Sequence, residues 1–209
     1  MLRLALQLTA VLLILVAAFT GSSEASIIYN FEGVTTISPG VFQFSYLASL
    51  APDQKVNSAV GANFGVLYDF TGLIPGSFTS TPLVAGITLT SVVQNLTVPQ
   101  PTFEVASDDP ALPNLRTDIA GTFTPTGTAN TDLYRVIARS TFNLLTLSSQ
   151  SAQTVKNVPG DPSDNTLAGN TVRIEVPTAT VPEPATLLLI GTGLVGLAAV
   201  RRRRQRTKA

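Results

Sequence analysis

The 209-residue chain contains no histidine and no cysteine, which restricts the chemistry open to its side chains. Ser-His-Asp and Cys-His nucleophile pairs are excluded, as are His-ligated and thiolate-ligated metal sites. Carboxylate pairs of the kind used in glycoside hydrolysis remain available. The adjacent acids Asp108 and Asp109 lie next to Pro110, where solvated charge is commoner than a catalytic pair. We therefore expect no catalytic residue, no cofactor and no enzymatic activity, with a carboxylate-dependent hydrolase as a remote alternative.

A second group of oxygen ligands lies on one turn, formed by Asp161, Asp164 and Asn165. Calcium prefers such ligands, but this segment has neither the glycine at the sixth position nor the closing glutamate of an EF-hand loop. Asp and Asn are also common in turns, because their side chains bond to the local backbone. We favour the turn role, with calcium as a weak alternative.

The most specific pattern is at the C-terminus, where Pro182, Glu183 and Pro184 precede sixteen uncharged, mostly apolar residues, 185–200. Each proline pushes the residue before it toward an extended conformation, so the motif is a stiff peptide with one carboxylate. As a helix, the apolar segment would measure roughly 24 Å at about 1.5 Å per residue, which is short for a membrane span. The basic cluster that follows predicts a cytoplasmic end. It consists of Arg201, Arg202, Arg203 and Arg204.

The N-terminus has the pattern of a secretory signal peptide. Arg3 supplies a positive charge, an apolar run follows, and Ser23 and Ala25 are small residues at the positions that signal peptidase recognises. We expect cleavage between Ala25 and Ser26 after export through the Sec translocon. An uncleaved N-terminal anchor is the alternative.

The body between these termini carries a net charge that the whole chain hides. Residues 26–181 include six basic and eleven acidic residues, a balance of −5, although the complete chain is neutral. Without a basic patch, nucleic acid is not expected as a partner. The body also lacks disulfides and must be stabilised by burial alone, for which its length is sufficient.

Within the body, apolar and polar residues alternate with the period of a β-strand. The clearest stretches are Phe42–Ala48, Tyr134–Leu144 and Thr171–Val176, and none repeats apolar residues at helical spacing for long. Residues 99–115 and 156–170 are expected to be irregular loops. We predict an all-β fold, an antiparallel β-sandwich of about seven to nine strands with jelly-roll or Ig-like order undecided. A loosely ordered Thr/Ser-rich stalk is the alternative.

These patterns divide the chain into five parts. They are a signal helix at 1–25, the exported β-domain at 26–176, a linker with the Pro-Glu-Pro motif at 177–184, a transmembrane helix at 185–200 and a basic cytoplasmic tail at 201–209.

The C-terminal pattern resembles the sorting signal of PEP-CTERM proteins. The family's Pro-Glu-Pro falls on Pro182, Glu183 and Pro184, its hydrophobic helix on 185–200 and its basic cluster on Arg201–Arg204. The resemblance implies a bacterial envelope protein whose membrane-anchored precursor is processed by an exosortase, and many members are associated with exopolysaccharide and biofilm production. We therefore expect an exported, non-enzymatic protein of the cell surface or extracellular matrix, with exopolysaccharide as a further partner. A carbohydrate-binding module at the cell surface is the alternative.

Overall fold

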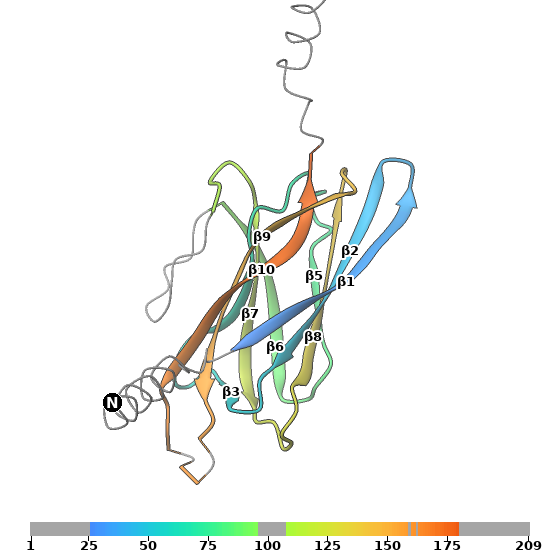
Figure 1. Cartoon of the computed structure of the whole chain (residues 1–209). Helices are drawn as coiled ribbons and strands as arrows, with labels where there is room; N and C mark the ends of the chain where they lie inside the picture. Colours follow the sequence, from blue (N-terminus) through green and yellow to red (C-terminus); the bar gives the residue numbers. More distant parts are fainter. Residues whose placement is uncertain (1–25, 96–107, 159, 162, 180–209) are drawn as a thin grey trace, which may run out of the picture.

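The computed structural model describes residues 26–95, 108–158, 160–161 and 163–179. In these residues the chain is all-β, with ten strands and no helix (Figure 1). The strands are β1 Ile27–Ser38, β2 Val41–Leu50, β3 Gln54–Asn57, β4 Asn63–Leu67, β5 Thr79–Pro82, β6 Ile87–Gln94, β7 Asn114–Phe123, β8 Thr131–Ser140, β9 Leu144–Lys156 and β10 Leu167–Thr178.

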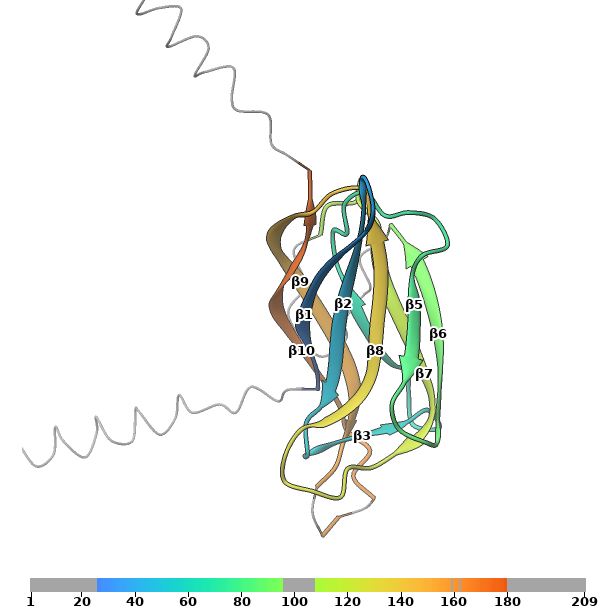
Figure 2. The same ribbon diagram turned by 90° about the vertical axis from the view of Figure 1, so that its right-hand side faces the viewer.

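The strands form two antiparallel sheets that share one hydrophobic core, an arrangement consistent with a β-sandwich or a barrel. The four-stranded sheet has the order β1-β2-β8-β5, and these strands lie side by side in Figure 2. The second sheet contains β10, β9, β3, β4, β7 and β6. Both sheets supply the core: Phe44 and Val136 come from the first, and Leu115 and Ile174 from the second.

Alternation along β2 and β8 places their apolar residues in this core. In β8, Tyr134, Val136 and Ala138 are buried, whereas Arg135 and Arg139 are exposed. Because successive side chains point to opposite faces, one apolar face is enough to fix the orientation of each strand. Fully burying one large apolar side chain contributes about 1.5–3 kcal/mol. The predicted alternation in these two strands is confirmed.

The second sheet contains an interrupted strand. Both β3 and β4 pair with β9 on one side and β7 on the other. They run in the same direction along their neighbours, since Asn57 pairs with Thr122 and Asn63 with Ile119. They therefore occupy one position in the sheet, and residues 58–62 leave it as a short excursion before the strand resumes.

Polar side chains are buried between the sheets as well. The hydroxyls of Tyr29 and Tyr134 lie 2.6 Å apart, and Gln150 accepts a hydrogen bond from Tyr29 N at 2.8 Å. Gly65 on β4 faces this tyrosine pair, and a Cβ there would lie 2.3 Å from the Tyr29 hydroxyl and 2.6 Å from that of Tyr134. The lack of a side chain at position 65 leaves room for both hydroxyls.

Several boundaries differ from the sequence prediction. The stretch Tyr134–Leu144 was expected to be one strand, but β8 ends at Ser140 and β9 begins at Leu144. Ser140 Oγ donates to Thr71 O and accepts a hydrogen bond from Phe142 N, which stabilises the turn between them. Both predicted loops also end earlier than expected, because β7 starts at Asn114 and β10 at Leu167.

The predicted signal helix at 1–25 and transmembrane helix at 185–200 lie outside the described residues. In the part of the chain that the structure describes, no helix is long and apolar enough to cross a membrane.

Candidate functional site

The strand interruption forms one wall of an open groove of about 460 Å³ on the second sheet. Ser58, Gly61 and Ala62 of the excursion lie on one side, and Thr90 of β6 lies on the other, with β7 between them as the floor. Extra residues within a strand frequently occur next to functional sites, because they redirect side chains at the sheet surface. The groove is lined by Ser58, Gly61, Ala62, Asn63, Thr90, Arg116, Asp118, Ile119 and Ala120.

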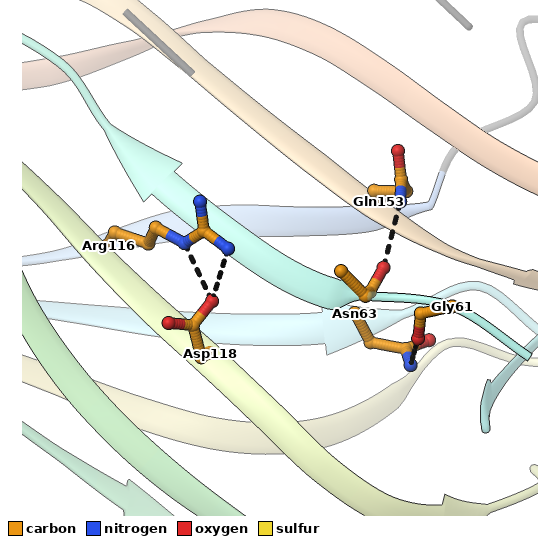
Figure 3. A network of polar contacts seen from close by, with 6 residues as sticks. Gly61, Asn63, Arg116, Asp118 and Gln153 are labelled. Atoms are coloured by element: carbon orange, nitrogen blue, oxygen red, sulfur yellow. Dashed lines mark hydrogen bonds and ion pairs between the residues drawn. The ribbon is translucent and has the colours of Figure 1, made fainter. Parts of the chain in front are cut away.

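Hydrogen bonds hold the excursion in place. Asn63 donates from Nδ2 to Gly61 O at 2.9 Å, and Gln153 of β9 donates from Nε2 to Ala62 O at 2.8 Å (Figure 3). At the other end, Ser58 Oγ accepts a hydrogen bond from Gly121 N at 3.0 Å. Asn63 and Gln153 are only 2% and 3% exposed. The groove wall is therefore anchored to buried residues of the packed sheet.

An ion pair on β7 lies at the floor of the groove. Arg116 Nε and Nη2 both approach Asp118 Oδ1 at 2.6 Å (Figure 3). The two residues share one face of the sheet because they are two positions apart in a strand. The Arg116 guanidinium also lies 4.5 Å from the ring centroid of Phe64 on β4, a cation–π contact that restricts its orientation.

This arrangement leaves one acceptor and one donor group open to a ligand. Both arginine nitrogens use the same carboxylate oxygen, so within the described residues Asp118 Oδ2 and Arg116 Nη1 have no hydrogen-bond partner. The paired charges largely cancel, which favours a neutral polar ligand over an anion or a cation. Asp118 is the only carboxylate among the residues that line the groove.

The turn considered for calcium uses its carboxylates locally. Asp161 Oδ1 accepts hydrogen bonds from Ser163 N and Oγ, and Asp164 Oδ1 accepts them from Thr166 N and Oγ1. The Thr166 hydroxyl, followed by its backbone N–H, lowers the pKa of Asp164 below the usual value. Among the described residues, no group of three or more His, Cys, Asp or Glu is placed to hold a metal ion. Asn165 is exposed on the same turn.

Asp108 and Asp109 take part in hydrogen bonds that connect the segment before β7 to the segment after β4. Asp69 has a positive φ of 59°, and its Oδ1 accepts a hydrogen bond from Asp109 N at 2.8 Å. Asp108 Oδ1 accepts one from Asn114 Nδ2 at 2.9 Å, and Asn114 Oδ1 accepts another from Asp69 N. Residues 108–114 are thereby joined to the segment that follows β4.

Of the predicted processing sites, only Ser26 lies within the described residues. It is fully buried, its N–H donates to Asn170 Oδ1 at 3.3 Å, and its hydroxyl lies 2.6 Å from that of Thr154. Ala25, the Pro182-Glu183-Pro184 motif and the cluster Arg201–Arg204 lie outside. Sequence reasoning missed the groove, because its residues come from three segments that only the sheet brings together.

Comparison with known families identifies the C-terminal segment. No curated protein and no solved structure matches the chain. Residues 180–204 match the family described as the PEP-CTERM protein-sorting motif, which covers the Pro-Glu-Pro peptide, the apolar segment and the four arginines. This motif implies export, a membrane-anchored precursor and processing by an exosortase. The chain is a protein that carries a PEP-CTERM sorting motif at its C-terminus.

Proposed function

We propose that this protein is a non-enzymatic component of the bacterial cell surface or extracellular matrix, released from its membrane anchor by an exosortase. The position of the sorting motif carries the proposal. The match begins at residue 180, directly after β10 ends at Thr178. The motif therefore follows the folded body without an intervening domain, and its removal would leave the body intact.

Each part of the chain has a role in this proposal. The Sec translocon exports the precursor, and signal peptidase removes residues 1–25. Residues 185–200 span the membrane, with Arg201–Arg204 on the cytoplasmic side. Pro182, Glu183 and Pro184 form the extended peptide that the exosortase recognises. The body is an antiparallel β-sandwich, supported by two sheets that share one core.

Mapping of the mature C-terminus in the native host tests this route. We expect the surface form to end near residues 182–184 and Glu183→Ala to leave uncleaved precursor in the inner membrane. Glu175→Ala on β10 is the matched control, because it also removes a glutamate carboxylate, but from the body, and should not affect cleavage. A surface protein that still ends at Ala209 would contradict exosortase processing.

The lack of enzymatic activity is part of the same proposal. In the groove the carboxylate is paired with Arg116. The other acids accept local hydrogen bonds: Asp69 from Asp109 N, Asp108 from Asn114 Nδ2 and Asp109 from Ala111 N. These contacts support structural roles. We further propose exopolysaccharide as a matrix partner. Deleting the gene should change the protein and polysaccharide composition of the extracted matrix, and an unchanged matrix would contradict that role.

A carbohydrate-binding module is the second candidate, and the groove is the observation that favours it. Neighbouring sugar hydroxyls can donate to Asp118 Oδ2 and accept from Arg116 Nη1, so one vicinal diol would use both open groups. The volume of about 460 Å³ lies within the range of small-ligand sites. The open shape suits a segment of an extended glycan.

Calorimetric titration of the full chain in a sugar-free zwitterionic detergent tests this candidate. The probes are cellotetraose, laminaritetraose and maltotetraose, with tetraethylene glycol as an ether control without vicinal hydroxyls. We expect a tetrasaccharide to bind and Arg116→Gln to abolish binding. Arg135→Gln is the matched control, since Arg135 forms a comparable surface pair with Glu32 on the other sheet. Binding that Arg116→Gln leaves unchanged would exclude the groove, and no binding would remove the candidate.

A further inference from the structure

We propose that an apolar patch beside the end of β10 rests on the membrane surface while the precursor is anchored. The patch is the exposed apolar start of β9, where Leu145 and Leu147 lie on one face of the strand and Leu144 on the other. This inference depends on the anchored precursor of the proposed function. It adds a contact between the folded body and the lipid headgroup layer.

The three leucines are unusually exposed for their type. Their exposed fractions are 46%, 45% and 56%, and they account for three of the eight exposed large hydrophobic residues among those described. Further along the same strand, residues 150–155 are all buried. β9 therefore changes from a solvent-facing apolar segment to a packed one. A local group of exposed apolar side chains marks an interaction surface when a partner lies within reach.

The register of β9 and β10 places this patch next to the membrane tether. Leu144 pairs with Thr178, and Leu145 pairs with Pro177. Paired strands lie about 5 Å apart, so the leucines adjoin the last residues of the body. Only residues 179–184 separate Thr178 from the apolar segment. Six extended residues reach at most about 20 Å, so the patch cannot move far from the bilayer.

The same end of the body also carries the β1–β2 hairpin turn (Figures 1 and 2). Ile37, just before this turn, is 46% exposed. The body has a net charge of −5 over residues 26–181, which does not favour an anionic headgroup layer. The attraction must therefore come from apolar insertion. A body held in this way would keep Pro182, Glu183 and Pro184 at a defined depth, where a membrane enzyme could reach them.

Site-specific fluorescence tests the contact, and the lack of cysteine in the chain makes single labelling straightforward. Leu145→Cys and Leu147→Cys of the full chain are labelled with an environment-sensitive dye. The proteins are reconstituted into phosphatidylethanolamine–phosphatidylglycerol vesicles that contain lipids spin-labelled at the headgroup. Ser163→Cys is the control, because it is exposed on the loop at the opposite end of β9 and β10. Ile190→Cys reports whether the anchor is inserted.

We expect a blue shift and severalfold stronger quenching at positions 145 and 147 than at 163. Quenching at 147 should be lost in the Leu144→Gln/Leu145→Gln variant, whose exposed substitutions should leave the unfolding midpoint unchanged. If the Ile190→Cys label is protected from solvent but the labels at 145 and 147 are not quenched, the proposed contact is wrong and the anchored precursor is still supported. A solvent-exposed Ile190 label contradicts the anchored precursor, and the contact falls with it. A blue shift without lipid quenching that grows with protein concentration assigns the patch to a second copy and also overturns the proposal.

Discussion

Gly65→Ala tests how the two sheets fit together. The new Cβ would lie 2.3 Å from the Tyr29 hydroxyl, 2.6 Å from the Tyr134 hydroxyl and 2.9 Å from Tyr29 Cε2. Ordinary contacts between heavy atoms are about 3.5–4.0 Å. At least one hydroxyl must therefore move by about 1 Å, which breaks the 2.6 Å hydrogen bond between the tyrosines.

Two costs determine the magnitude. Overpacking of a core typically costs about 1–3 kcal/mol. A buried hydroxyl that loses its partner costs about 1–3 kcal/mol more. We expect Gly65→Ala to lower the free energy of unfolding by roughly 2–6 kcal/mol. For a domain of this size, each kcal/mol lowers the midpoint temperature by about 2–4 °C.

Equilibrium urea unfolding of the full chain in a zwitterionic detergent measures the loss. Circular dichroism and tyrosine fluorescence serve as probes, because the chain has no tryptophan. Gly127→Ala is the matched control. Its Cβ would meet nothing closer than Ala129 N at 3.9 Å, so its effect should remain within about 0.5 kcal/mol.

A double variant separates steric conflict from a general effect of replacing glycine. Tyr29→Phe removes the hydroxyl nearest to the new Cβ, so Gly65→Ala/Tyr29→Phe should lose less stability than the two single variants added together. We expect a coupling of about 1–2 kcal/mol. Additive losses, or a Gly65→Ala protein as stable as the wild type, would refute the packing argument.

Three further predictions follow from other buried or strained groups. Burial raises the pKa of Tyr29, Tyr46 and Tyr134 above the usual value of about 10; the unfolded chain therefore loses these protons first. The free energy of unfolding should be constant below about pH 10 and fall above it, by roughly 1.4 kcal/mol per pH unit for each tyrosine. Urea titrations at a series of pH values should show a shallower fall for Tyr46→Phe. A profile that stays flat above about pH 10 contradicts this prediction. Asp69→Ala removes two side-chain hydrogen bonds. It also replaces aspartate, which tolerates a positive φ, with a residue that rarely adopts one. It should cost about 2–4 kcal/mol against less than about 1 for Asp69→Asn, measured by the same unfolding assay, and equal losses would count against the strained turn. Because Ser26 is buried, signal peptidase should cleave unfolded precursor but not refolded precursor at Ala25–Ser26, and gel analysis showing equal cleavage would contradict this.

Local pattern explains why some strands could be predicted. Strands β2 and β8 have one apolar face, so their side chains alternate in the sequence as they do in space. Strand β9 could not be recognised in this way, because neither its exposed start nor its buried segment alternates between apolar and polar residues. Gln150, Ser151, Gln153 and Thr154 are polar and yet at most 3% exposed. Their hydrogen-bond partners include Ile27 O, Ala62 O and Gln54 Oε1, all distant in sequence.

The candidate groove was unpredictable for a similar reason. Arg116 and Asp118 are two positions apart, but a charged pair in a strand normally indicates only a solvent-facing side. The groove exists because residues 58–62 leave the sheet between β3 and β4, which no local pattern near Arg116 indicates. Thr90 reaches the same surface through its pairing with Asp118.

The sequence by itself determined the sorting motif, the all-β class and the exclusion of histidine and cysteine chemistry. These depend only on residue type and on the order of residues along the chain. The sorting motif, a Pro-Glu-Pro peptide followed by an apolar segment and four arginines, is defined by that order and does not depend on how the body folds. The tertiary structure decided the interrupted strand, the buried tyrosine pair against Gly65, the open groove and the leucines beside the tether. Each of these depends on contacts between segments that lie far apart along the chain. Such contacts are selected by sheet pairing and core packing, which local sequence does not encode.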